Sequence, residues 1–473
     1  MSYRLMPEGH GSHVRASFYL VTPLAHEATV KRTTETTDVL YSDRSGAVSP
    51  LIDSDDGRQS DVYSVKERSI PPTTRGLRTL ATATRTSTTR AMSSSASQSA
   101  DKIDINIAGF DFESLVQAYY DCRKHKRNTL SSLEFEQHLE HNLGELFDEL
   151  VSGQYKPGKS ICFVVTHPKP REVWAADFRD RIVHHFLYNA ISPRFEASFI
   201  ADSCACIKGR GTLYAVERLE SKIRSITQDW SKPAHYLKLD LANFFVSINK
   251  NVLWSQLQAK IHEPAWLQLA EIILWHDPRE NYERRCKLEL FNLVPLHKRL
   301  ACQPAHRGLP IGNLSSQFFA NIYLNALDWF VKHDLRCKHY ARYVDDFILL
   351  HEDPKQLSTW KRRIEEWLPT TLGVKINPSK TIQQPVNRGV DFVGQLIKPH
   401  CRTIRRRTMN DAIHRIKASN RDQFEQIQSY FGLATQASHS HNDRMRIAKA
   451  ARDQGYVVNL SANKCYRKRN RMG

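Results

Sequence analysis

Two adjacent aspartates, Asp345 and Asp346, stand between two strand-like runs, and this pattern constrains the fold more than any other feature of the chain. Residues 338–343 precede the pair and residues 347–350 follow it, and both runs have the length and residue types of β-strands. The segment therefore predicts a β-hairpin whose tip projects both carboxylates outward. A third aspartate, Asp240, ends another predicted strand at residues 236–240.

Bringing Asp240 beside Asp345 and Asp346 would build an oxygen-only site for two Mg²⁺ ions about 3.5–4 Å apart, with Mn²⁺ as a possible substitute. In that geometry one ion activates an attacking 3′-hydroxyl and the other holds a triphosphate. Carboxylates suit a hard cation of this kind. Taken alone, an Asp-Asp dipeptide is also typical of a solvated turn, and the dipeptide does not decide between the two interpretations.

Strand and helix patterns interleave along the chain without a regular βαβ repeat, which favours an α+β fold over a doubly wound sheet. Apolar residues at helical spacing predict two amphipathic helices between residues 110 and 150. Further patterns predict a buried strand at 160–166, a helix at 179–188, a strand at 390–393, and a helical C-terminal region with a break around 432–441.

Residues 69–100 contain fifteen Ser or Thr in 32 positions and almost no large apolar side chains. Such a composition cannot bury enough surface to offset the entropy lost on ordering. We therefore expect residues 1–100 to be a disordered, low-complexity extension. Met92 stands just before the first organised segment, so an over-extended gene start is an alternative to a functional tail.

Lysine and arginine exceed aspartate and glutamate by 18, which favours polyanionic partners, nucleic acid first and an anionic membrane second. The charge is concentrated in residues 401–473, which contain sixteen basic and five acidic residues. Nine cysteines without a Cys-x-x-Cys pair indicate a reduced, cytoplasmic protein. No apolar run approaches the roughly 20 residues of a membrane span, so we expect no membrane partner.

Four blocks of the sequence resemble the palm motifs of reverse transcriptases in content and order. They lie at residues 236–245, 308–317, 341–347 and 390–394. The Tyr-Val-Asp-Asp element at residues 343–346 is among the most specific signatures of that family. The resemblance covers about residues 110–470. It implies an RNA-directed DNA polymerase that works on template RNA, a primer or cDNA, and dNTPs.

The resemblance also implies a right-hand polymerase fold. The N-terminal helices and fingers would occupy residues 101–235, the palm residues 236–398, and a basic helical thumb and tail residues 399–473. Asp240, Asp345 and Asp346 match the catalytic, metal-binding triad.

Several positions match residues that bind the incoming nucleotide. Lys169 and Arg171 correspond to finger residues that neutralise the triphosphate, although a solvated basic face is the alternative. Phe245 stands five residues after Asp240, where its ring could pack under the sugar and exclude a 2′-hydroxyl. A core phenylalanine is the alternative, and it fits Phe244 better because successive strand side chains face opposite ways.

Other matches imply contacts with the template and primer or a role in proton transfer. Lys380 corresponds to a position where polymerases place a general acid for the pyrophosphate leaving group. His184 and His185 are expected on a helix as packing and surface residues rather than metal ligands. The residues expected to contact template or primer are Lys208, Arg210, Gly308, Ser316, Gln317, Tyr343 and Gly394.

Departures from the usual motifs indicate which kind of reverse transcriptase the chain resembles. Ile311 stands where most reverse transcriptases have glutamine, and Gln317 where they have proline. With residues 321–325, this pattern is similar to the enzymes of diversity-generating retroelements. Those enzymes make error-prone cDNA from a template-repeat RNA, miscopy mainly adenines, and work with a small basic helical accessory protein.

Two other functions stay open. One is a related bacterial reverse transcriptase used in phage defence, which the neighbourhood of the gene would distinguish. The other is a non-catalytic RNA-binding scaffold. The three buried acids argue against a scaffold, because they are costly to retain unless a metal ion neutralises them.

Overall fold

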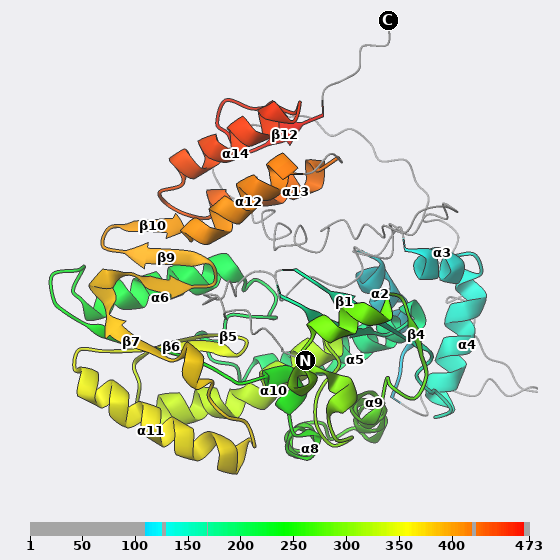
Figure 1. The fold of residues 1–473 in the computed structure, drawn as a ribbon. Helices are drawn as coiled ribbons and strands as arrows, with labels where there is room; N and C mark the ends of the chain where they lie inside the picture. Colours follow the sequence, from blue (N-terminus) through cyan, green and yellow to red (C-terminus); the bar gives the residue numbers. More distant parts are fainter. Residues whose placement is uncertain (1–108, 125–128, 168, 419–421, 468–473) are drawn as a thin grey trace, which may run out of the picture.

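The computed structural model describes residues 109–124, 129–167, 169–418 and 422–467. Helices and antiparallel strands are mixed in it, which confirms the α+β class (Figure 1). The predictions for residues 1–100, including the role of Met92, lie outside the described residues.

A four-stranded sheet in the order β5-β6-β3-β7 forms the centre of the molecule. All its neighbouring pairs are antiparallel. The register places Asp240, the last residue of β3, directly opposite Asp346, the first residue of β6. The strands are β3 (His235–Asp240), β5 (His339–Tyr343), β6 (Asp346–His351) and β7 (Ile382–Pro385).

Helices cover the central sheet on both sides. α6 (Thr212–Ile226) packs against β5 and β6, α11 (Pro354–Thr371) packs against β3, β6 and β7, and Figure 1 shows the sheet between these two helices. Asp353 caps α11 by accepting a hydrogen bond from the Lys355 N–H, and Pro354 suits the first helical turn. Because both faces are covered, the first five residues of β6 are all buried.

A second sheet has the order β2-β1-β4. β1 (Ser160–Val165) and β2 (Arg171–Ala175) form an antiparallel hairpin, and β4 (Tyr282–Arg284) joins β1 in parallel. After β4 the chain runs through three short 3₁₀ helices. They are η4 (Leu288–Leu293), η5 (Leu296–Lys298) and η6 (Leu300–Cys302).

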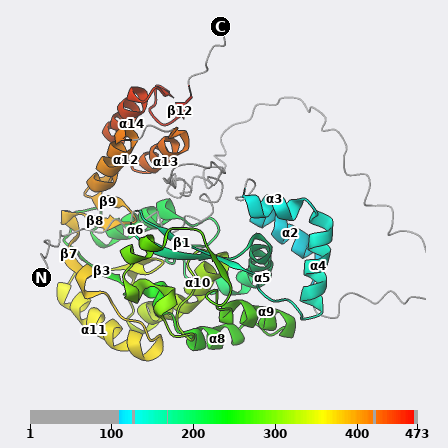
Figure 2. The same ribbon diagram turned by 45° about the vertical axis from the view of Figure 1, so that its right-hand side comes forward.

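The N-terminal helices form a group beside the central α5 (Figure 2). The sequence predicted two helices before residue 150, but the structure has three, because the second pattern is interrupted between Glu136, where α3 ends, and Leu139, where α4 begins. Thr129 caps α3 by accepting a hydrogen bond from the Ser132 N–H. The helices of this half are α2 (Phe112–Arg123), α3 (Leu130–Glu136), α4 (Leu139–Val151), α5 (Phe178–Glu196), α8 (Lys250–Gln258) and α9 (Pro264–Trp275).

The C-terminal region begins with an antiparallel sheet in the order β10-β9-β8 and ends in a helical layer at the top of Figure 1. The predicted helix break is confirmed, since α13 ends at Thr435 and α14 begins at His441. The elements are β8 (Val390–Phe392), β9 (Gln395–Lys398), β10 (Cys401–Ile404), α12 (Arg406–Ala418), α13 (Phe424–Thr435), α14 (His441–Asp453), β11 (Val457–Val458) and β12 (Cys465–Tyr466).

The hydrophobic packing divides the chain near residue 400. One continuous core includes buried residues from Phe110 to Ile397, so the segments before and after residue 235 share it. The C-terminal helices have a separate core that contains Ile416, Phe431 and Ile447. Arg402 links the two parts through a 2.9 Å ion pair with Glu220 on α6.

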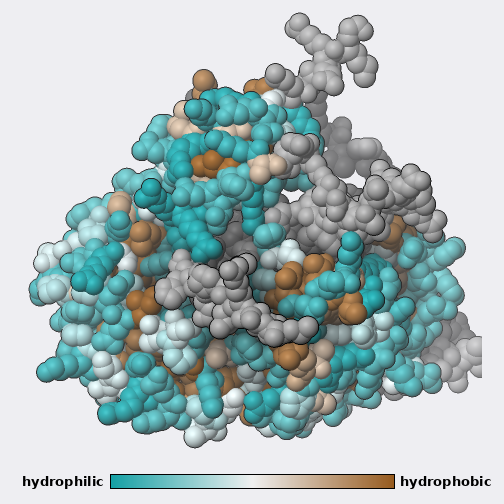
Figure 3. Space-filling view, viewed as in Figure 1, coloured by the Kyte–Doolittle hydropathy of each residue, from teal (hydrophilic) through white to brown (hydrophobic). Residues whose placement is uncertain are grey.

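The surface is mostly hydrophilic in the view of Figure 3, with an apolar patch in the region where Figure 1 places β1. Within the described residues, no helix is both long and apolar enough to cross a bilayer.

Candidate active site

The β5–β6 hairpin places two of the three aspartates at the end of the central sheet. Val344 and Asp345 form its turn, and Val344 has φ +54°, a value that is rare for a β-branched residue. The Leu241 N–H donates to the Asp345 carbonyl at 3.2 Å, so the turn lies against the end of β3. The prediction that both carboxylates project outward is wrong, since Asp345 and Asp346 are only 7% and 6% exposed, and Asp240 is 1% exposed.

Two lysines accompany the buried carboxylates. Lys380 Nζ lies 3.1 Å from Asp240 Oδ1, and Lys238 Nζ lies 3.1 Å from Asp346 Oδ2. Lys238 stands two residues before Asp240 on β3, so strand alternation puts both side chains on one face. The two ammonium groups offset two of three negative charges and so reduce the cost of burying the aspartates.

The metal ligands expected from the sequence come together only in part. Among the residues described here, no group of three or more His, Cys, Asp or Glu side chains has the geometry to hold a metal ion. The donor set nevertheless fits Mg²⁺, because this ion is bound in proteins by one or two carboxylates together with substrate phosphates and water. Asp240 and Asp346 are opposite each other in the sheet, and Asp345 is adjacent to Asp346 in the chain.

A cavity of about 580 Å³ opens beside the hairpin tip. Of the residues that the sequence pointed to, it brings six to its wall: Lys169, Arg171, Phe245, Ile311, Asp345 and Lys380. They come from segments more than 200 residues apart in the chain. Four cationic side chains and two carboxylates line the wall, and one of the carboxylates, Glu172, accepts the Leu300 N–H at 2.5 Å. The cavity therefore has an excess of positive charge next to one catalytic candidate, as an anionic ligand requires.

The aromatic residue of this cavity lies on a short helix, α7 (Phe244–Ser247), rather than on the strand that the sequence predicted. Asn243 before it has a left-handed conformation with φ +49°, which turns the chain abruptly after β3. Phe244 is buried against Tyr323 and Phe245 is only partly buried, and both contribute to the cavity wall. The two phenylalanines therefore differ in burial, and the cause of this difference is a helical turn.

One wall of the cavity was missed by the sequence analysis. The segment from the end of η4 to the end of η5 contributes Leu293, His297 and Lys298 to it. Two backbone N–H groups of η6, from Leu300 and Ala301, donate to Glu172 on β2 and fix this segment against the second sheet. The basic run at residues 297–299 was the available signal, but the sequence alone gives no reason to bring it to Asp345.

None of the residues expected to contact template or primer lines the cavity, although Gly308 lies directly behind Val246 of its wall. The Arg210 guanidinium donates to the carbonyls of Ile200 and Ser203 at 2.8 and 2.9 Å, which fixes its own loop. Gly394 has φ +87° and its carbonyl accepts the Arg405 N–H. Of the others, Lys208 is exposed, Gln317 is partly buried, and Ser316 and Tyr343 are buried.

His184 is buried on α5 and beside it His185 is partly buried, which agrees with the packing and surface roles expected for them. Burial is the main cause that lowers the pKa of His184 to about 3. The positive charges of His185, Arg181 and His276 lower this pKa further. The imidazole is therefore neutral at physiological pH.

Residues 167–397 match the family model described as reverse transcriptase (RNA-dependent DNA polymerase). This segment is a reverse transcriptase domain. It contains all three aspartates and every cavity residue named above. The match assigns the segment to the RNA-directed DNA polymerases, which are nucleotidyltransferases.

Solved telomerase structures are also similar to the chain containing this reverse transcriptase domain. An apo telomerase from Candida tropicalis, truncated from its C-terminal domain, is 13% identical over 52% of this chain and 54% of its own, with a TM-score of 0.40. A telomerase from Candida albicans in complex with a TWJ fragment of telomeric RNA is 10% identical over 68% and 59%, with a TM-score of 0.42. The chain thus spans little more than half of these proteins. No curated protein sequence matches it.

Proposed function

We propose that this protein is an RNA-directed DNA polymerase that transfers a nucleotide from a dNTP to the 3′-hydroxyl of a primer paired with template RNA. The observation that carries the proposal is the cavity in which Asp345 faces the same space as Lys169, Arg171 and Phe245. An acidic group, a cationic wall and one aromatic side chain are what a reaction on a nucleoside triphosphate needs.

In this proposal each wall of the cavity has its own task. Lys169, Arg171 and Lys298 bind the triphosphate and offset its charge, with arginine's fork suited to two phosphate oxygens. Phe245 packs under the sugar and excludes a 2′-hydroxyl. Lys380, at 3.1 Å from Asp240, protonates the pyrophosphate leaving group.

Reverse transcriptases in general use divalent metals, and Asp240, Asp345 and Asp346 are the residues that would hold Mg²⁺ here, or Mn²⁺ as a substitute. When bound, the ions would supply Lewis-acid stabilisation of the reacting phosphate and of the attacking oxygen. The pairing of Asp240 with Asp346 across β3 and β6 supports this assignment, because it brings two of the three carboxylates to one end of the central sheet.

We further propose that residues 101–235 are the fingers region, 236–398 the palm and 399–473 the thumb. The separate core of the C-terminal helices supports a thumb that follows the palm. Its sixteen basic residues suit a surface that tracks the phosphates of template and primer. The proposed contacts at Lys208, Gln317 and Gly394 lie outside the thumb and would add to this surface.

The finer proposal is a cytoplasmic enzyme of the diversity-generating kind, which makes error-prone cDNA from a template-repeat RNA with a small basic accessory protein. Its support is Ile311, which lines the cavity where a glutamine would supply hydrogen bonds. The Ile311 carbonyl accepts the Trp174 N–H at 2.8 Å, so its backbone is fixed against β2 of the second sheet.

The polymerase proposal is tested with Asp345→Asn, using Asp334→Asn, an exposed aspartate elsewhere on the chain, as the matched control. We expect Asp345→Asn to abolish Mg²⁺-dependent primer extension and to leave RNA affinity nearly unchanged, because RNA binding rests on the distributed basic surface. Both quantities are measured on one preparation. Near-normal extension by the Asp345 variant would contradict the assignment.

The subtype is tested by sequencing cDNA that the enzyme makes on the RNA encoded beside its own gene. The proposal expects substitutions concentrated at template adenines. An even error spectrum, or a gene neighbourhood without a template repeat and a variable repeat, would favour the phage-defence alternative.

A further inference from the structure

A fully buried arginine lies directly behind the hairpin tip. Arg342, on β5, and Asp328, on α10 (Leu314–Trp329), are both 0% exposed. Their side chains form a bidentate pair, with Nε to Oδ1 at 2.7 Å and Nη2 to Oδ2 at 2.6 Å. Tyr340 donates to the same carboxylate at 2.8 Å. An ion pair in this position is costly to desolvate and contributes little net stability.

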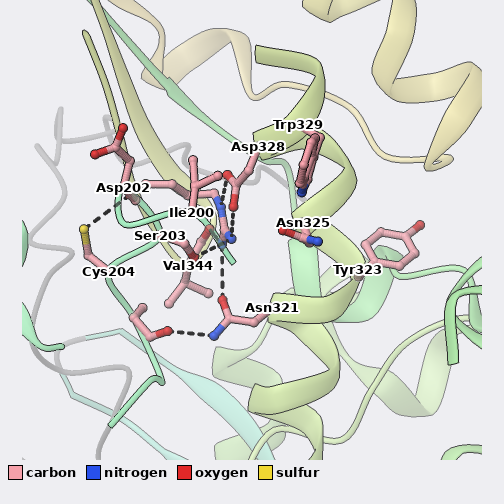
Figure 4. Close-up of polar contacts among 12 residues, drawn as sticks. Ile200, Asp202, Ser203, Cys204, Asn321, Tyr323, Asn325, Asp328, Trp329 and Val344 are labelled. Carbon is pink, nitrogen blue, oxygen red and sulfur yellow. Dashed lines mark hydrogen bonds and ion pairs between the residues drawn. The ribbon is translucent and has the colours of Figure 1, made fainter. Parts of the chain in front are cut away.

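The rest of the guanidinium binds groups that have no role in charge compensation. Its remaining N–H groups donate to the Val344 carbonyl at 3.1 Å, the Asn321 amide oxygen at 3.3 Å and the Ser203 hydroxyl at 2.8 Å. With Asp328, five donors thus meet five acceptors. Figure 4 shows Asn321 and Asp328 extending from the helix toward Ser203 and Val344.

The backbone of Arg342 is also fixed. Its N–H donates to the Asp202 carbonyl and its own carbonyl accepts the Cys204 N–H, both at 2.9 Å. Asn321 in turn donates to the Ala205 carbonyl at 2.6 Å. The segment 202–205, α10 and β5 are therefore joined around one side chain.

The hydrogen bonds of Arg342 stabilise the strained backbone of Val344. Val344 precedes Asp345, and its φ of +54° is unfavourable for a β-branched side chain. Such a conformation persists only when the surroundings determine it. The hydrogen bond from Arg342 to the Val344 carbonyl is a contact of this kind, made from a group that cannot move without breaking four others.

We propose that Arg342 is a positioning residue for the catalytic carboxylates: through the Val344 carbonyl it holds the hairpin turn that places Asp345 in the cavity. This inference rests on the proposed polymerase function. It assigns the buried pair to the geometry of the reaction and not to the stability of the fold.

The first test removes both charges together. In Arg342→Met/Asp328→Asn no charge is left unpaired, and the asparagine still offers an acceptor to Tyr340. We expect the variant to fold with a lower unfolding temperature, because the buried oxygens of Val344, Asn321 and Ser203 lose their donor. Its kcat should be lower by about 10- to 100-fold, and its KM for dNTP changed much less. The control is Arg194→Met/Glu263→Gln, which removes a bidentate pair between α5 and α9, with expected wild-type kinetics.

The second test measures the dependence on the strained turn. Glycine adopts positive φ without cost, so Val344→Gly should make the turn less dependent on Arg342. Arg342→Lys keeps the charge beside Asp328 but cannot reproduce the five-donor fork. We expect this change to lower kcat by about 10-fold or more when residue 344 is valine, and by about threefold or less when it is glycine. The comparison uses only folded variants that keep the charge.

The outcomes separate this inference from the function on which it rests. Absence of extension by the wild-type enzyme would refute the polymerase proposal. If the wild type extends primers, wild-type kcat in the folded double variant, or an equal loss from Arg342→Lys in both backgrounds, would show that the buried pair only supports the fold. A loss that depends on residue 344 supports positioning.

Discussion

Gly308 occupies a position where a single methyl group should measurably disturb the wall of the cavity. Its φ is +88°, and its N–H donates to the Ile248 carbonyl at 2.8 Å. A Cβ at this residue would lie 2.6 Å from Leu300 Cδ1 and 3.3 Å from the Val246 backbone. Gly308→Ala therefore combines an unfavourable backbone conformation with a steric clash against α7 and η6.

Both contributions can be sized. An L-residue in the left-handed region costs about 1–2 kcal/mol, and overpacking costs about 1–3 kcal/mol. The lower entropy of the unfolded alanine chain offsets about 0.4–1 kcal/mol. Gly308→Ala should thus lower the free energy of unfolding by about 2–4 kcal/mol.

Gly373→Ala is the matched control, because Gly373 has φ +65° but no atom lies within 4 Å of the point that an alanine Cβ would occupy there. Only the backbone cost applies there, and we expect about 1 kcal/mol. Denaturant titration of both variants gives the two free energies of unfolding. Equal destabilisation would refute the argument that Gly308 is required by the close approach of Leu300 and Val246.

Three further outcomes are expected. Phe245→Ala should admit ribonucleotides, and competing dNTP and rNTP incorporation measures this as a ratio of kcat/KM, with each tenfold loss equal to about 1.4 kcal/mol; an unchanged ratio would return Phe245 to a packing role. Ile311→Gln should lower misincorporation opposite template adenine by about tenfold if one hydrogen bond is restored, as deep sequencing of cDNA would show; an unchanged error rate in an active variant would contradict this. The folded-state pKa of His184 lies near 3, below its ordinary 6.5. The stability that the neutral His184 ring contributes is therefore fully present above pH 6.5 and is lost as the pH falls toward 3. His184→Gln should flatten that dependence by up to about 1.4 kcal/mol per pH unit, and equal slopes for the two proteins would contradict the assignment.

The elements that the sequence predicted well are those specified by neighbours in the chain. The strand-like runs on either side of Asp345 and Asp346 form β5 and β6, and the run that ends at Asp240 forms β3. Alternation and turn chemistry act over a few residues, so they can be recognised without knowing the rest of the fold. The order of the motif blocks then indicated the family before any contact was known.

The same reasoning failed where burial depends on distant segments. Asp345 and Asp346 were expected to project outward from the tip of the hairpin, because a turn directs its side chains away from the two strands. The burial of Arg342 was not predicted, since an arginine in a strand is typically at the surface. Its burial depends on Asp328, Asn321 and Ser203, which belong to α10 and to the segment before α6.

The sequence by itself determined the hairpin, the three candidate carboxylates and the residue types suited to a triphosphate. Only the tertiary structure decided which of them share a cavity. Pairing β4 with β1 brings residue 282 next to residue 160 and carries the segment with Lys298 to the cavity wall. Such contacts are selected by the packing of the whole chain, because each is too weak to be specified by the residues on either side of it.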